Sequence, residues 1–200
     1  MGKKKNKKKK KGAAAASGAA KLGGNQHDVE RLKFLADALG GDDDGSQGPG
    51  PDLGLLARLD SESPAQREIG CATVGVHLFQ ASMARVPLLC EFLAIGGTLE
   101  RLMQLLEDAA VGVARAAAKA LRNYSLVGGT RGCEELAKRG MAAGGSRLLQ
   151  EGGHRGDPSF LAHIFAILSS IATQVLEDVG QVATPGVVQI STGARAECHT

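Results

Sequence analysis

The sequence predicts an all-α protein in which short helices stack side by side as an α-solenoid. Hydrophobic residues make up 43% of the chain and aromatic residues only 3%, so the core must be built from Leu, Ala, Val and Ile. That composition is typical of packed helices. The apolar residues recur at helical spacing rather than in strict alternation. Part of the chain also matches a later part of itself, which indicates structural repeats.

The self-match is clearest at a displacement of 47 residues. It aligns LLARLD (55–60) with LMQLLE (102–107), and QREIGCATV (66–74) with VARAAAKAL (113–121). A weaker third copy follows, in which a displacement of 43 aligns Gly97 with Gly140 and one of 46 aligns Leu121 with Ile167. Helical repeats of about 40–47 residues are the signature of armadillo and HEAT proteins. We therefore predict an armadillo/HEAT-type solenoid of two to three repeats over residues 55–178.

The clearest repeat predicts three helices, over residues 88–95, 98–106 and 110–124. Gly96 and Gly97 should form the corner between the first two, because a tight turn between helices favours glycine. Small side chains in the third helix should let it approach its neighbours closely. These are Ala114, Ala116, Ala117, Ala118 and Ala120.

The segments outside the repeats are of four kinds. Residues 1–26 should be a disordered, Lys-rich tail. Residues 27–39 carry apolar side chains at helical spacing and predict one amphipathic helix, followed at 40–54 by a linker of Gly, Pro and Asp. Residues 179–200 have no clear helical period and should be irregular.

The basic tail suggests a transport signal that is read by charge. Such a block is typical of a nuclear or nucleolar address, although an RNA contact and a basic terminus without a specific role remain alternatives. The candidate targeting residues are Lys3, Lys4, Lys5, Lys7, Lys8, Lys9, Lys10 and Lys11.

The charge of the remaining chain differs in sign from that of the tail. The net charge of the chain is +3, and removal of the eight tail lysines leaves −5 for residues 12–200. A mildly acidic body suits a basic partner through complementary electrostatic fields. The alternative is that this charge only keeps the domain soluble.

Sequence motifs of catalysis are absent, so we expect a binding protein and not an enzyme. The chain has no G-x-S-x-G, no phosphate-binding G-x-x-x-x-G-K-[ST] and no His-Glu-x-x-His. The four cysteines form no Cys-x-x-Cys pair and have no metal-binding spacing with histidine, so we expect no metal and no cofactor. No apolar run approaches the roughly 20 residues that a membrane span requires.

The third helix of the repeats carries the candidate binding residues. Arg115, Lys119 and Asn123 recur every four positions and share one helix face. In armadillo solenoids this helix lines the concave groove, where an Asn amide can hydrogen-bond to the backbone of an extended peptide. The alternatives are a solvated polar face for the two cations, and a cap or an inter-repeat hydrogen bond for Asn123. The predicted cargo groove comprises Glu68, Arg115, Lys119, Arg122 and Asn123, and its counterparts at the 47-residue displacement include Ala72 and Val76.

The segments FLAIGGTLERLMQLLED (92–108) and VARAAAKALRNYS (113–125) resemble an armadillo repeat. Residues 55–150, with the Lys-rich start, are further similar to the amino-terminal part of the symportin family, the HEAT repeat-containing protein 3 family. The similarity lies chiefly in LLARL and the following Ser-Pro-Ala-Gln-Arg-Glu, in ALRNYS (120–125) and in GGTRGCEEL (128–136).

The resemblance implies a transport adaptor that chaperones large-subunit ribosomal proteins of the 5S particle and carries them into the nucleus. It further implies an importin-type receptor as a second partner, and shuttling between cytoplasm and nucleus. The chain departs from the family pattern because it has no Pro-Tyr dipeptide and no HEAT array. A general armadillo scaffold, and an RNA-binding ribosome-assembly factor acting through the tail, remain alternative functions.

The tail hypothesis makes a direct prediction. Residues 1–12 fused to a cytoplasmic reporter should concentrate it in the nucleus or nucleolus, because eight clustered lysines form a charge-read signal. Fluorescence microscopy of the fusion measures this, with a Lys-to-Gln tail as the matched control. A fusion that stays diffuse would show that the tail is not an address.

Overall fold

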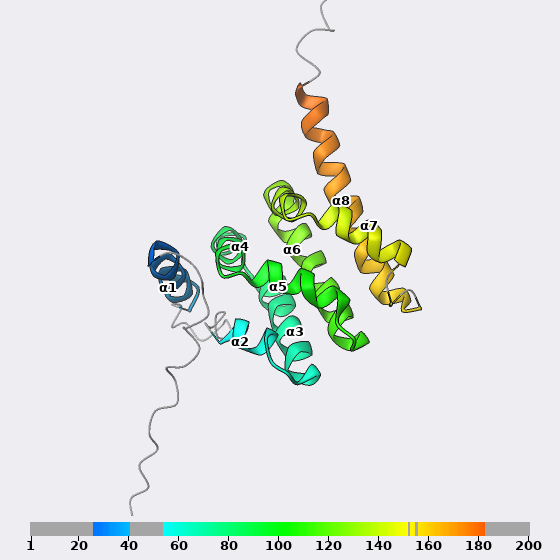
Figure 1. The fold of residues 1–200 in the computed structure, drawn as a ribbon. Coiled ribbons are helices and arrows are strands. Elements are labelled where there is room, and N and C mark those ends of the chain that lie inside the picture. Colours follow the sequence, from blue (N-terminus) through cyan, green and yellow to red (C-terminus); the bar gives the residue numbers. More distant parts are fainter. Residues whose placement is uncertain (1–25, 41–53, 152, 155, 183–200) are drawn as a thin grey trace, which may run out of the picture.

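The computed structural model describes residues 26–40, 54–151, 153–154 and 156–182, and every regular element in these ranges is a helix (Figure 1). The all-α prediction is confirmed. Residues 1–25 of the predicted tail, residues 41–53 of the linker and residues 183–200 lie outside the described residues, whereas Gln26 and Gly40 belong to the first helix. The elements are α1 (Gln26–Gly40), α2 (Leu55–Leu59), α3 (Pro64–Gln80), α4 (Val86–Ile95), α5 (Thr98–Gln104), the 3-10 helix η2 (Leu105–Glu107), α6 (Val111–Lys138), α7 (Met141–Glu151) and α8 (Pro158–Val182).

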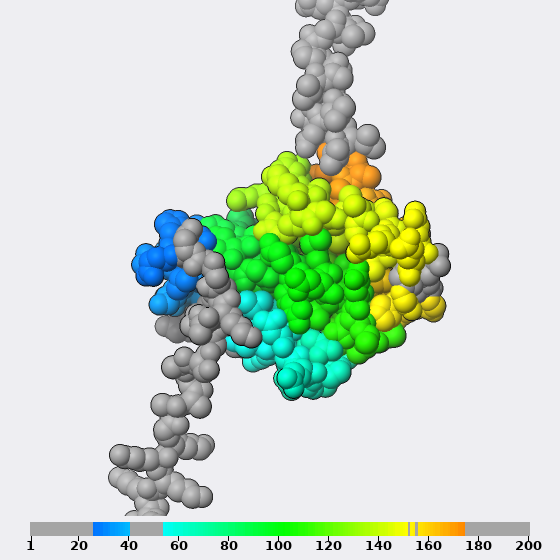
Figure 2. All heavy atoms as spheres, in the orientation of Figure 1, coloured from blue at the N-terminus to red at the C-terminus, as the bar shows by residue number. Residues whose placement is uncertain are grey.

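The helices pack side by side from α1 at one end of the described chain to α8 at the other (Figure 1). Helix α6 packs between α3 and α8, while α1 packs against α4 and α7 against α8. In the space-filling view the colours accordingly pass from blue at α1 through green to orange at α8 (Figure 2). This arrangement is compatible with an α-solenoid.

Two successive helix triplets have the same corner. The first comprises α4, α5 with η2, and the first part of α6, and the second comprises the end of α6, α7 and α8. The first two helices of each triplet meet at a glycine with positive φ, Gly97 (72°) or Gly140 (83°). This left-handed backbone favours glycine because it carries no Cβ. The displacement of 43 residues had aligned these two positions.

Helix α6 is longer than predicted. The sequence places its end at residue 124, but the helix continues to Lys138 through a kink at Gly129 (φ 54°, ψ −142°). The two parts of α6 meet at Gly129 with no intervening loop, so the Gly128-Gly129 pair produces a kink and not a separate connection.

The other predicted boundaries differ by smaller amounts. Helix α4 begins at Val86 rather than residue 88, and the helix predicted to end at residue 106 changes at Leu105 into a 3-10 turn. Helix α8 continues past the predicted boundary at residue 178 to Val182, so the prediction of irregular structure is wrong for residues 179–182.

One hydrophobic core runs through the stack. Side chains from α1 to α8 join a single buried cluster. Its fully buried members include Leu35, Leu59, Leu99, Leu121, Leu136 and Ile167. Because the apolar face of each helix is covered by the next helix along the stack, the triplets depend on one another for stability.

Helix α1 confirms the predicted amphipathic helix and adds a contact that the sequence did not indicate. Its apolar face, Leu32, Leu35 and Leu39, is buried in the common core. The Arg31 guanidinium donates to the Glu91 carboxylate of α4 over 2.7 Å. The helix therefore packs on the repeat region although residues 41–53 separate the two in sequence.

Ion pairs join successive helix layers at a regular separation. Asp60, after α2, pairs with Arg101 of α5 at 2.8 Å, and Glu107 of η2 pairs with Arg147 of α7 at 2.7 Å. A displacement of 46 or 47 residues relates the two pairs, so the displacement that aligns the apolar positions also aligns these surface charges.

A more buried pair joins α3 to the corner before α6. The Nε of Arg67 donates to Asp108 over 2.7 Å, and the Asp108 side chain is only 7% exposed. The same carboxylate accepts the Ala110 N–H over 2.9 Å at the start of α6. The Arg67 hydrogen bond is the main cause that holds the pKa of Asp108 below its usual range.

Stability should therefore decrease in acid through Asp108. Because its pKa is lower in the folded chain, its contribution is complete above the unfolded value, about pH 4, and is lost as the pH falls through the folded pKa. Urea unfolding between neutral and acid pH should show Asp108→Asn to be less stable than wild type at neutral pH, with a smaller loss on acidification. An acid dependence identical to wild type would contradict this role.

The core makes a second prediction. Leu121→Ala should lower the free energy of unfolding by about 2–5 kcal/mol, because the side chain is fully buried and its loss leaves a cavity. Leu126→Ala on the same helix is the matched control, since Leu126 is exposed and should change stability by about 0.5 kcal/mol or less. Equal effects in chemical denaturation would contradict the burial of Leu121.

Candidate binding groove

A groove of about 770 Å³ lies along α3, α6 and the start of α8. All five residues of the predicted cargo groove line it, namely Glu68, Arg115, Lys119, Arg122 and Asn123. Their predicted counterparts Ala72 and Val76 line it too. The helical spacing and the 47-residue displacement together thus identified one continuous surface.

The predicted residues come from two neighbouring helices. Glu68 lies exposed on α3, while Arg115 and Lys119 are exposed on α6. Arg122 and Asn123 are half-buried one helical turn further along α6. The small Ala116 and Ala120 lie between these polar residues and keep the groove open.

Asn123 fastens the two helices together. Its Nδ2 donates a hydrogen bond of 3.1 Å to the carbonyl oxygen of Gly75 on α3. An added Cβ at Gly75 would lie 3.7 Å from this nitrogen, so the two helices are close at that point. The inter-repeat hydrogen bond, one of the alternatives given for Asn123, is therefore present in the structure. The carboxamide still has a second N–H and an oxygen that can form hydrogen bonds with a ligand.

The three cations of the groove differ in whether a carboxylate lies near them. Arg115 approaches Asp157 at 3.4 Å, where that carboxylate also accepts the Ser159 and Phe160 N–H groups at the start of α8. Within the described parts of the chain, Lys119 and Arg122 have no ion-pair partner. Their charge is available to a ligand.

The charged side chains of the groove affect the pKa of His163, which lies on α8. It lines the groove and is half-buried, and its pKa is lowered, first by burial and then by the nearby charges of Arg122 and Lys119. Asp157 opposes the shift and Arg115 adds to it. Three cations and one carboxylate line the groove, so its local charge is positive in spite of the negative net charge of residues 12–200.

An exposed apolar strip on α3 completes the groove. Val76 is 50% exposed and Phe79, one turn further along the same face, is 82% exposed. The 47-residue displacement identified Val76 but not Phe79, which i,i+3 spacing could have found. It also missed Ser159 and His163, because the longer connection before α8 shifts the repeat register there.

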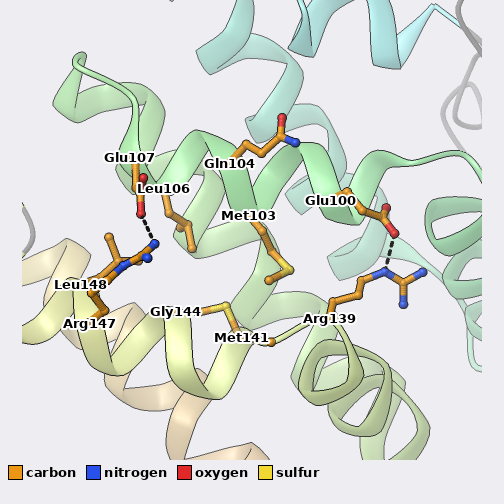
Figure 3. A pocket seen from close by; sticks show the side chains of 11 residues that line it. Glu100, Met103, Gln104, Leu106, Glu107, Arg139, Met141, Gly144, Arg147 and Leu148 are labelled. Carbon is orange, nitrogen blue, oxygen red and sulfur yellow. Dashed lines mark hydrogen bonds and ion pairs between the residues drawn. The ribbon is translucent and has the colours of Figure 1, made fainter.

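A second cavity, of about 520 Å³, lies between the α5–η2 segment and α7 (Figure 3). The Glu100–Arg139 pair (2.6 Å) and the Glu107–Arg147 pair (2.7 Å) lie at either side of it, with methionine side chains between them (Figure 3). Because these four charged side chains pair with one another, this cavity has fewer unpaired charges with which to bind a ligand than the groove has.

Among the described residues, the metal-ligating side chains do not gather into one group, and two cysteine thiols have raised pKa values. No group of three or more His, Cys, Asp or Glu among them could hold a metal ion. Burial raises the pKa of Cys71 to about 12 and of Cys90 to about 11, so both thiols stay protonated at neutral pH. No helix of the described chain has the length and apolar character needed to cross a membrane.

Comparison of the chain with protein-family models, curated proteins and solved structures found no match.

Proposed function

We propose that the helix triplets are armadillo-type repeats. The glycine corner between the first two helices, the long third helix and the near-constant 43–47-residue displacement support this assignment. In this assignment α1, α2 and α3 form the first repeat, and α3, α6 and α8 are the successive third helices that line the groove.

The groove supports a protein-binding function. We propose that it holds an extended segment of another protein, and that the chain is a transport adaptor or chaperone of the symportin type. The observation that carries the proposal is the convergence of Glu68, Arg115, Lys119, Arg122 and Asn123 on one open groove. Extended segments suit such a surface because their backbone amides are free to meet polar side chains.

The cargo in this proposal is a large-subunit ribosomal protein of the 5S particle. The acidic body attracts a basic cargo protein at long range, and an importin-type receptor reads the Lys-rich tail. The adaptor accordingly moves between cytoplasm and nucleus. Its work is binding and release, with no chemical step assigned to any residue.

The test compares two tryptophan variants of the full chain. Ala72→Trp places a bulky side chain in the groove, whereas Ala65→Trp places it on an exposed part of α3 outside the residues that line it. Surface-immobilised chain should capture purified ribosomal proteins of the 5S particle, and Ala72→Trp should weaken capture about tenfold or more, which corresponds to roughly 1.4 kcal/mol.

Ala65→Trp should bind as wild type does, and circular dichroism should show equal helicity for both variants. Absence of capture by the wild-type chain would reject the ribosomal cargo. Capture that is unaffected by Ala72→Trp would place the binding outside the groove.

A further inference from the structure

The two long walls of the groove differ in chemistry. The α3 wall presents the exposed apolar side chains Val76 and Phe79. The α6 wall presents the cations Arg115, Lys119 and Arg122. A ligand that lies across both helices therefore meets an apolar strip first and a basic strip next.

Glu68, the only carboxylate of α3 that lines the groove, lies close to the start of α6. Glu68 lies over the first turn of α6, where an added Cβ on Gly112 would be 2.6 Å from its Oε2. A carboxylate is favourable at the start of a helix because it interacts with the helix dipole. Glu68 is thus placed to interact with the positive amino-terminal end of α6, and no ion pair joins it to Lys119 or Arg122 in the described part of the chain.

We propose that the segment bound in the groove is acidic and carries an apolar side chain, with the apolar group on α3 and the carboxylates on Lys119 and Arg122 of α6. This inference rests on the proposed protein-binding function and specifies its ligand. It reverses, for the groove alone, the expectation of a basic partner drawn from the net charge. Carboxylates pair with lysine and arginine at short range, where local charge outweighs the charge of the whole chain.

The helix separation sets the spacing within the segment. Packed helices lie about 8–10 Å apart, and an extended chain advances about 3.3 Å per residue. The acidic residues should therefore follow or precede the apolar residue by about three positions.

The same features favour a protein ligand over a nucleic acid. Phosphates along an RNA strand would be attracted to α6, but on α3 they would meet the Glu68 carboxylate and the aliphatic Val76, and only Phe79 offers a face on which a base could stack. An apolar anchor with flanking carboxylates satisfies both walls.

The experiment measures binding of labelled peptides to the full chain by fluorescence anisotropy. The probe carries Leu-Phe with a Glu-Asp cluster about three positions away, and a second probe replaces the acidic residues by Lys and Arg. Lys119→Glu with Arg122→Glu tests the groove. The control, Lys33→Glu with Arg131→Glu, makes the same charge change at exposed positions outside the groove. The two double variants therefore have the same net charge and the same Lys-rich tail.

The acidic probe should bind more tightly than the basic one. The groove variant should bind the acidic probe about tenfold or more weakly than wild type, whereas the control variant should lose much less affinity. Removal of Leu-Phe from the probe should weaken binding as well. Equal binding of the two probes, or equal losses in both variants, would overturn the inference. So would single-stranded RNA that binds through Lys119 and Arg122 while the acidic peptide does not.

Failure here is distinguishable from failure of the proposed function. If the chain captures ribosomal proteins through the groove and rejects the acidic probe, the adaptor function stands and the acidic ligand is wrong.

Discussion

The close packing of α6 between α3 and α8 is the constraint on which the rest of the fold depends. Small residues make it possible at the contact with α3, where Gly75 lies beside Ala120 and an added Cβ would be 3.9 Å from the Ala120 Cα. Because the helices are so close, Asn123 can reach the Gly75 carbonyl. The same small residues leave the space between the two helices shallow and open. The close packing and the groove therefore both result from these small residues.

Charge is distributed differently over the two faces of the stack. On the face formed by α2, α5 and α7, acidic and basic side chains of successive layers pair, as Asp60–Arg101 and Glu107–Arg147 do. Exposed pairs of this kind contribute little to stability individually, at most about 1 kcal/mol each. In the groove, Lys119 and Arg122 form no ion pair with a carboxylate of the described residues. This contrast is the reason for assigning binding to the groove and a structural role to the opposite face.

Much of the groove could be predicted because its positions are related by helical spacing and by a fixed displacement. The four-residue spacing of Arg115, Lys119 and Asn123 fixed their common face, and the 47-residue displacement located Glu68 opposite them. Phe79 and His163 escaped this reasoning for different reasons. Phe79 lies beyond the matched segment, while the connection before α8 differs in length and shifts the register. The packing of α1 on α4 also escaped, since the linker between α1 and α2 conceals their proximity.

The sequence by itself determined the helical class, the period of the repeat and the glycine corners, because these depend on local spacing and on backbone conformations that few residues adopt. Only the tertiary structure decided that α6 continues through a kink at Gly129, that Asn123 binds a neighbouring helix, and that Arg115 has a carboxylate partner while Lys119 does not. These properties depend on which side chains from distant parts of the chain meet, and neither composition nor period contains that information.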